Sequence, residues 1–228
     1  MTRRPIVAID GPAGAGKSTV ARGVASRLGF TYVDTGAMYR AAALRCVRGG
    51  IDPADAEACG EAAAAMRLEF APGAAGVQRV LADGEDITDA IRTPEISALS
   101  SPVSKHPGVR LAMTGLQRKM GARGGVVMEG RDIGTVVYPD AEVKVFLTAS
   151  AEERARRRAA ERVAADVVAD VTAILREINE RDERDTTRAE APLRQADDAR
   201  LLVTDGLTPE QVIDAIVAWA NEAGEGAQ

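Results

Sequence analysis

One stretch of eight residues combines glycines, a lysine and a serine at a spacing that suits the binding of phosphate groups. Residues 11–18 read Gly-Pro-Ala-Gly-Ala-Gly-Lys-Ser and match the P-loop pattern G-x-x-x-x-G-K-[ST]. The glycines allow a tight turn with inward-pointing backbone N–H groups, and the N-terminus of a following helix adds partial positive charge. The motif predicts that Lys17 reaches the β- and γ-phosphates of ATP and that the Ser18 hydroxyl ligates Mg²⁺.

The residues on either side give this motif the context that it requires. Ile6–Ile9 is a β-branched apolar run typical of a buried strand, and Thr19–Ala25 begins an expected helix. The alternative interpretation is a glycine-rich turn with a chance lysine. Such a turn would not need a strand before it and a helix after it. The residues expected to bind the triphosphate are Gly11, Pro12, Ala13, Gly14, Ala15, Gly16, Lys17, Ser18 and Thr19.

Two further segments place arginines at the ends of expected strands. Asp34–Arg40 and Glu129–Gly134 each follow a short apolar run, and ligands collect at the carboxyl ends of strands in a parallel α/β sheet. Arg40 and Arg131 would supply positive charge for a second phosphate, beside the one that the P-loop lysine holds. Phosphoryl transfer needs two repelling phosphates neutralised and held in line. The alternatives are an exposed helix arginine at position 40 and a structural ion pair between Arg131 and Asp132.

Two basic helices are expected in the last third of the chain. Three arginines of the first share one face, Arg154, Arg158 and Arg162, and the second carries Arg176, Arg181, Arg184, Asp185 and Arg188. Such a run is usually a solvated helix surface. The functional alternative is a mobile lid that brings arginines over a polyphosphate and excludes water. Ser150, followed three residues later by Glu153, predicts a capping box at the start of the first helix.

Several motifs of other P-loop proteins are absent from the sequence. The strings N-K-x-D and D-x-x-G of GTPases do not occur, and neither does the D-G-F-P-R string of adenylate kinases. These absences speak against a nucleotide switch. The single histidine, His106, is expected at the surface, and a phosphate acceptor needs positioning rather than deprotonation.

Most of the chain predicts an alternation of strands and helices, which favours an α/β fold. One predicted antiparallel patch interrupts this alternation. Its strand candidates are Leu68–Phe70 and Val77–Leu81. Asp83-Gly84 is a hairpin turn signal, after which Glu85–Thr88 runs back alongside the preceding strand. Further helices are expected at 16–28, 51–66, 94–104, 109–120 and from Thr208, with strands at 30–33, 125–128, 141–147 and 201–203. Thr208 is expected to cap the last of these helices, with Pro209 at its first position and Gln211 at N3. We expect one domain with a core at 1–66, 106–150 and 190–222, an insert at about 67–105, a lid at about 151–189 and a tail at 223–228.

Composition limits the class of protein. The 228 residues are 46% hydrophobic with a net charge of −5, so we expect a packed core and neither a nucleic-acid partner nor a membrane partner. Cys46 and Cys59 lack C-x-x-C spacing, which argues against a zinc site or a disulfide scaffold. The N-terminal residues lack the apolar stretch of a signal peptide. We expect a cytoplasmic monomer.

Five segments together resemble one family. Gly11–Ser18, Asp34–Arg40, Ile91–Thr93, Glu129–Val137 and Arg181–Asp185 are similar to the corresponding segments of the bacterial cytidylate kinases, which are P-loop nucleoside monophosphate kinases. The likeness covers nearly the whole chain. It implies a three-layer α/β/α fold with a five-stranded parallel sheet, a small antiparallel insert in the NMP-binding region and a helical lid. It implies Mg-assisted, in-line transfer of the ATP γ-phosphate to CMP or dCMP.

The resemblance also implies roles for individual residues. Those expected to bind the acceptor are Thr35, Arg40 and Arg131 for the phosphate, Ser101, Arg110 and Asp132 for cytosine, Asp185 and Arg181 for the ribose, with Tyr39 and Arg188 beside them. The catalytic set is Lys17, Arg131, Arg188 and the lid arginines Arg157 and Arg158.

The base reading also has its own chemical rationale. A carboxylate accepts from N4 of cytosine and a guanidinium donates to N3 and O2, whereas uracil would turn an oxygen toward the carboxylate. Two other functions stay open from the residues alone: a small P-loop kinase for UMP or shikimate, and a P-loop switch without an acceptor.

Overall fold

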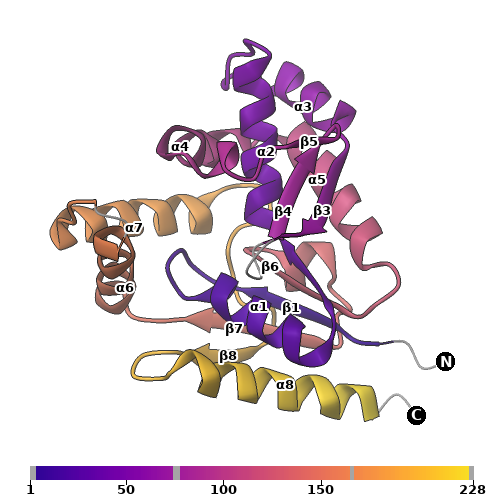
Figure 1. Cartoon of the computed structure of the whole chain (residues 1–228), viewed down its shortest axis with the longest axis vertical. Coiled ribbons are helices and arrows are strands. Elements are labelled where there is room, and N and C mark those ends of the chain that lie inside the picture. Colours follow the sequence, from indigo (N-terminus) through magenta and orange to yellow (C-terminus); the bar gives the residue numbers. More distant parts are fainter. Residues whose placement is uncertain (1–3, 74–77, 165–166, 226–228) are drawn as a thin grey trace. The chain divides into compact units, whose positions relative to one another are not determined.

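The computed structural model describes residues 4–73, 78–164 and 167–225, and its chain divides into two compact units (Figure 1). The first unit, here the sheet unit, comprises Met1–Tyr32 and Gly121–Gln228. The second, here the hairpin unit, comprises Val33–Met120. The two are described in turn.

The sheet unit is built on parallel strands. β1 pairs in parallel with β6 on one side and with β7 on the other, and β7 pairs in parallel with β8. The five strands run in the order β2-β6-β1-β7-β8. Their bounds are β1 Ile6–Asp10, β2 Thr31–Asp34, β6 Val126–Gly130, β7 Val143–Thr148 and β8 Arg200–Val203. All residues of β1 and β6 are buried, as expected for central strands that are covered on both faces.

Helices α1 (Lys17–Leu28) and α8 (Pro209–Glu225) pack side by side on one face of this sheet (Figure 1). Val7 and Ile9 of β1 join the apolar core beneath them. Because side chains alternate along a strand, Asp10 points to the opposite face, where the π-helical turn η3 (Ile133–Val137) lies against β1. The predicted sheet and its helical layers are therefore confirmed.

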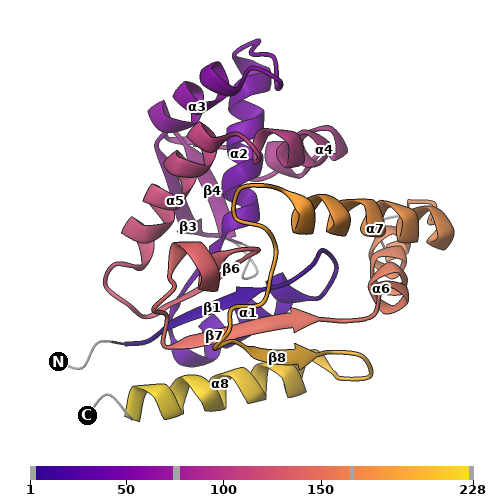
Figure 2. The ribbon, with the colours of Figure 1, turned by 180° about the vertical axis from the view of Figure 1, so that it is seen from behind.

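Helices α6 (Ala151–Ala164) and α7 (Val171–Thr187) pack against each other around a small apolar core of their own (Figure 2). The predicted capping box at Ser150 is only half right. Ser150 Oγ accepts from the N–H of Glu153 at 3.3 Å. The return bond is replaced, since the Ser150 N–H donates to Asp205 and the Glu153 carboxylate pairs with Arg157.

The hairpin unit contains the predicted antiparallel patch. Strands β3, β4 and β5 pair in that order, and the turn at Asp83 and Gly84 has φ of 52° and 87°, the conformation that favours Asp-Gly. Val77, predicted in the second strand, lies outside the described residues. The bounds are α2 Thr35–Arg48, α3 Ala56–Ala65, β3 Leu68–Pro72, β4 Gln78–Ala82, β5 Glu85–Asp86, η2 Ala90–Arg92, α4 Pro94–Val103 and α5 Pro107–Gly121.

Other local predictions need correction. The helix expected from Ile51 begins only at Ala56, because Asp55 caps it through the N–H of Ala58. His106 is half-buried, and its Nε2 lies 2.7 Å from the carbonyl oxygen of Pro53. Helix α8 continues to Glu225, so the expected tail starts later than position 223.

Two findings bear on the protein class. Cys46 and Cys59 are free thiols whose sulfur atoms lie 3.3 Å apart. Within the three described ranges, no helix is both long and apolar enough to cross a membrane.

Candidate functional site

The P-loop connects β1 to α1 and has the conformation that its glycines predict. Gly14 and Gly16 have φ of 77° and 87°, which an L side chain adopts only with strain. Helix α1 starts at Lys17 without a side-chain cap and without an acidic residue in its first turn. Its N-terminal N–H groups and positive dipole end are therefore available to an anion.

Lys17 lies inside this loop rather than in solvent. Its side chain is buried, and Nζ donates to the carbonyl oxygen of Pro12 at 2.7 Å. Burial lowers the pKa of Lys17 well below its ordinary value, and the positive charge of Arg131 lowers it further. A bound triphosphate would offset both effects, because its negative charge favours the ammonium form.

Gly11 is the glycine with the least room, and it provides a test of the loop. A Cβ atom at this position would lie 1.9 Å from the carbonyl oxygen of Leu147 in β7. We expect Gly11→Ala to lower the free energy of unfolding by about 4 kcal/mol or to prevent folding, as measured by urea denaturation. Gly50→Ala is the matched control: φ is 64° but nothing lies within 4 Å, so about 1 kcal/mol is expected. Equal losses in the two variants would contradict this packing argument.

Helix α6 contributes to the P-loop through a residue that the sequence interpretation left in the lid. Arg154 is buried, and its Nη1 donates to the carbonyl oxygen of Ala13 at 3.0 Å. The same nitrogen lies 2.6 Å from Asp182 of α7. Arg154, itself a residue of α6, therefore connects the P-loop to α7 as well. The regular spacing of the arginines indicated a shared face, but it could not show that this member is buried.

The two lid arginines predicted to be catalytic differ in their surroundings. Arg157 is half-buried and donates to the Thr204 side chain and carbonyl at 2.9 and 2.8 Å, and its Nη1 lies beside Gly16. Arg158 is also half-buried, and it makes no hydrogen bond or ion pair within the described part of the chain. Arg157 is thus held at the P-loop by neighbours, while Arg158 is not fixed by a partner.

An ion-pair cluster follows β6 in the sheet unit. Arg131 Nε donates to Asp185 at 2.9 Å, and Arg188 Nη2 lies 3.7 Å from Asp132. Arg131 thus pairs with an aspartate of α7, 54 residues further along the chain. Arg181 Nε lies 4.0 Å from the same aspartate.

The electrostatics of Asp185 show how concentrated this positive charge is. Burial alone would raise the pKa of Asp185. The guanidinium groups of Arg131, Arg181 and Arg188 outweigh burial and hold the pKa below its ordinary value. Three cationic side chains thus surround one carboxylate on the sheet unit that also carries Lys17.

The hairpin unit carries the other predicted acceptor residues. Asp34 caps α2 by accepting from the N–H of Ala37 at 2.9 Å, and it also pairs with Arg40 at 3.1 Å. The buried Nε of Arg40 makes no hydrogen bond to any described residue. Such an atom is uncommon in a native interior, where a water molecule or a ligand can serve as its partner.

Tyr39, Ser101 and Arg110 also belong to this unit. The guanidinium carbon of Arg110 lies 5.6 Å from the centre of the Tyr39 ring, and Arg110 is buried. The Ser100 hydroxyl donates to the Ser97 carbonyl at 2.9 Å, whereas the half-exposed Ser101 hydroxyl has no such bond within the described residues. This difference favours Ser101 over Ser100 as the residue available to a ligand.

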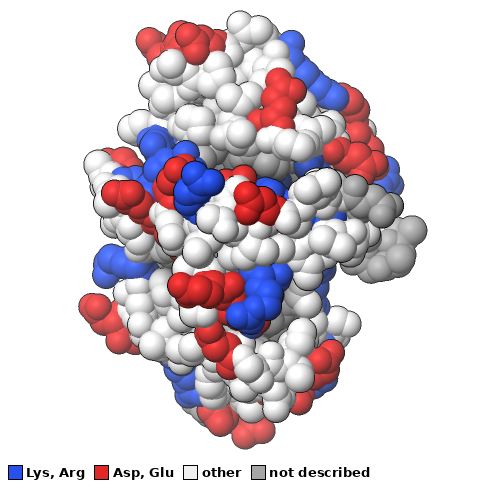
Figure 3. Space-filling model, turned by 90° about the vertical axis from the view of Figure 1, so that its left-hand side faces the viewer, with Lys and Arg blue, Asp and Glu red and all other residues white. Residues whose placement is uncertain are grey.

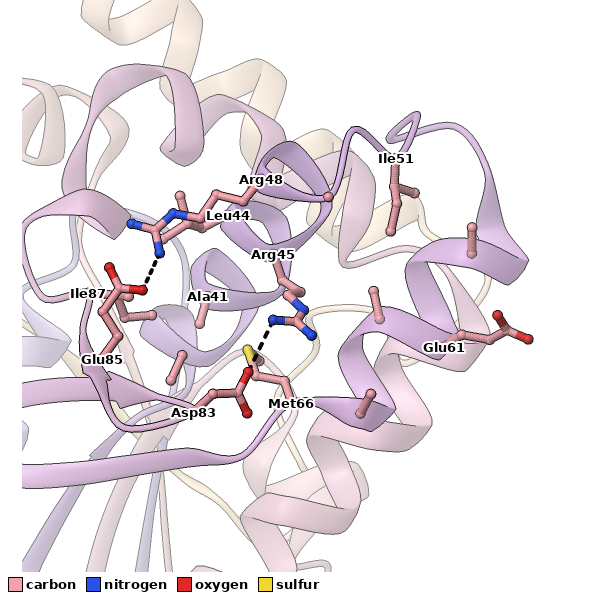
Figure 4. Close-up of a pocket in the computed structure, with 15 residues that line it drawn as sticks. Ala41, Leu44, Arg45, Arg48, Ile51, Glu61, Met66, Asp83, Glu85 and Ile87 are labelled. Carbon is pink, nitrogen blue, oxygen red and sulfur yellow. Dashed lines mark hydrogen bonds and ion pairs between the residues drawn. The ribbon is translucent and has the colours of Figure 1, made fainter.

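A pocket of about 580 Å³ opens in the hairpin unit, between α2, α3 and the β4–β5 turn (Figure 4). Figure 4 shows Arg45 directed toward Asp83 and Arg48 directed toward Glu85, and these pairs measure 3.1 and 2.7 Å. The remaining wall is mainly small apolar side chains such as Ala41. None of the predicted site residues lines this pocket, and its arginines are already neutralised.

The charged side chains on one face of the molecule do not resemble a large binding surface of a single charge. On the face shown in Figure 3, basic and acidic side chains are interspersed and form no extended area of one sign. Within the described residues, no group of three or more His, Cys, Asp or Glu side chains is arranged to hold a metal ion.

Comparisons with known proteins cover nearly the whole chain. A family model described as cytidylate kinase matches residues 7–222. The chain is 52% identical over 218 residues to a cytidylate kinase from Pelotomaculum thermopropionicum (strain DSM 13744 / JCM 10971 / SI), with 96% of each chain covered. It is 55% identical over 217 residues to a bifunctional pantoate ligase/cytidylate kinase from Synechococcus sp. (strain WH7803), a match that covers 95% of this chain and 44% of the relative. The chain therefore spans less than half the length of that bifunctional relative.

A solved structure of an uncharacterized protein from Eubacterium ventriosum ATCC 27560 is similar in fold, with a TM-score of 0.50 at 12% identity over 95% of this chain and 98% of that one. It bears on the fold alone. The resemblance seen in the sequence motifs is confirmed by the family model and by the end-to-end relative. The chain belongs to the cytidylate kinase family.

Proposed function

We propose that this protein transfers the γ-phosphate of ATP to CMP or dCMP and releases ADP with CDP or dCDP. One observation carries the proposal beyond family membership. The sheet unit holds a P-loop lysine and a cluster of three arginines whose charges already act on that lysine or on Asp185. A protein that binds only a triphosphate does not need this second set of cations, whereas transfer between two phosphates does.

The donor half follows from the P-loop. The N–H groups at the start of α1 and the Lys17 ammonium bind the phosphates of ATP. The Ser18 hydroxyl is exposed at the first turn of α1 and makes no hydrogen bond within the described ranges, so it suits a Mg²⁺ ion that takes its other ligands from phosphates and water. Mg²⁺ would neutralise the negative charge that develops during transfer.

The acceptor half is proposed residue by residue. Thr35, Arg40 and Arg131 hold the acceptor phosphate, and the unsatisfied Nε of Arg40 supports its part in this. Cytosine is read by Asp132, which accepts from N4, and by Arg110, which donates to N3 and O2 and whose orientation Tyr39 stabilises. Ser101 completes the base contacts, while Asp185 with Arg181 binds the ribose hydroxyls.

Phosphoryl transfer to CMP requires that the reacting groups are positioned and that their negative charge is compensated, but it does not require a general base. The attacking oxygen belongs to a phosphate that is already ionised, so no side chain has to remove a proton. Arg131 and Arg188 compensate the charge on the acceptor side. Arg157 lies beside Gly16 at the donor side, and Arg158 is the second candidate on the same helix. Both would also exclude water from the transferring group.

A coupled assay of ADP release separates this function from the alternatives. We expect ADP release that depends on CMP or dCMP and that is at least about a hundredfold slower with UMP. AMP and shikimate should give only the background rate. Turnover with UMP or shikimate but not with CMP would instead identify a kinase for another acceptor. ATP binding without acceptor-dependent release would leave a nucleotide switch.

A further inference from the structure

Asp10, the last residue of β1, makes a contact that the proposed mechanism has not used. Its side chain is 5% exposed, and its two carboxylate oxygens accept from the backbone N–H groups of Ile133 and Gly134 at 2.8 and 2.7 Å. These bonds join residues 123 and 124 positions apart in the sequence. They connect the strand that leads into the P-loop with the turn that follows Arg131 and Asp132.

The N–H groups concerned are the ones that a helical turn leaves without a partner. Ile133 and Gly134 begin η3, and Asp132 occupies the position before it, where an aspartate would ordinarily cap the turn. Asp132 makes no side-chain capping bond. Asp10 supplies that cap from another strand, and the Asp132 carboxylate is directed instead toward Arg188, 3.7 Å away.

The packing around this cap leaves it little freedom. A Cβ atom at Gly134 would lie 3.3 Å from the Lys144 side chain and 3.4 Å from Oδ2 of Asp10. Asp10 is kept at this place although burial raises its pKa to about 6. An apolar residue would avoid that cost, so the carboxylate must do something that an apolar residue could not do.

We propose that Asp10 is a positioning residue for the acceptor nucleotide, because its carboxylate fixes the turn that directly follows Arg131 and Asp132. By capping η3, it holds Arg131 where it meets the acceptor phosphate and keeps Asp132 turned toward the base. Asp10 directly precedes Gly11, the first residue of the P-loop. Its bonds to η3 therefore fix the position of that turn relative to the P-loop, and both belong to the sheet unit. The inference rests on the proposed function, since it assigns a role in binding CMP.

Asp10→Asn tests this role with little change in volume. The amide can accept from only one of the two N–H groups and presents its own NH₂ group to the other. We expect the KM for CMP to rise about tenfold or more and the preference for CMP over UMP to fall by a similar factor, as for other groups that orient a functional side chain. The KM for ATP should stay within about twofold, because the contacts of the P-loop to phosphate are retained. Asp10→Ser serves as a second variant with a small acceptor.

Thr208→Ala is the matched control for a loss of stability. Its hydroxyl accepts from the N–H of Gln211 at 3.3 Å and caps α8. Removal of the hydroxyl should lower the free energy of unfolding by about 1 kcal/mol without changing the KM for CMP or the preference for CMP over UMP. If folded Asp10→Asn or Asp10→Ser retains both the KM for CMP and the CMP preference, the positioning role is wrong. The same holds if both variants fail to fold, which would make Asp10 purely structural. A wild-type protein that does not phosphorylate CMP would overturn the proposed function itself.

Discussion

Lys17→Met is expected to lower kcat for phosphoryl transfer to CMP by about a thousandfold or more while the protein remains folded. The variant keeps the length and apolar stem of the side chain and removes only the ammonium group that would face the β- and γ-phosphates of bound ATP. Because that charge acts on the transition state more than on bound ATP, the loss should fall mainly on kcat.

The stability of this variant provides a second, independent expectation. Burial is the main reason why the pKa of Lys17 is lowered, so the native state carries a cost for the ammonium form at neutral pH. Methionine removes that cost, and the melting temperature should stay the same or rise. Lys119→Met is the matched control, since Lys119 is exposed on α5. Its kcat should be unchanged, whereas a Lys17→Met protein that still turns over at the wild-type rate would refute the role of Lys17.

Asp132→Ala is expected to lower the ratio of kcat/KM for CMP to that for UMP by about a hundredfold. Asp132 is buried, with 4% of its surface exposed, and its carboxylate lies 3.7 Å from Nη2 of Arg188. In the proposed complex it accepts from N4 of cytosine, and it repels O4 of uracil. Removing it takes away both the attraction and the repulsion, so turnover of CMP should fall while turnover of UMP rises relative to it.

Asp132→Asn makes the same test sharper. Its amide group can donate to O4 of uracil as well as accept from N4, so the preference should move further toward UMP than in the alanine variant. Asp140→Ala, at an exposed position in the loop before β7, is the control and should leave the ratio unchanged. Equal losses on CMP and UMP in both Asp132 variants would show that Asp132 supports the fold or the phosphate rather than reading the base.

Local signals in the sequence predicted the parts of the fold that local chemistry decides. The P-loop, the Asp-Gly turn of the hairpin and the cap of α8 each depend on residues within a few positions. At the last of these, Thr208 and Gln211 bond reciprocally, at 3.3 and 2.9 Å. The Ser150 box failed because Asp205, 55 residues away, competes for the same N–H group.

The parts of the candidate site that the sequence did not predict depend on distant partners. Arg131 follows β6 directly in the sequence, but its partner Asp185 lies 54 residues further along the chain. No spacing rule connects Asp10 with the N–H groups of η3 for the same reason. Arg154 was recognised as one of a basic series, yet only tertiary packing decides which member of the series is buried against the P-loop.

The most direct test of phosphoryl transfer follows the γ-phosphorus atom itself. The protein is incubated with CMP, Mg²⁺ and ATP labelled in its γ-phosphate, and the labelled products are separated by chromatography. We expect the label to appear in the β-phosphate of CDP at the rate at which ADP forms. Label recovered only as inorganic phosphate, or remaining in ATP when CMP is present, would contradict it.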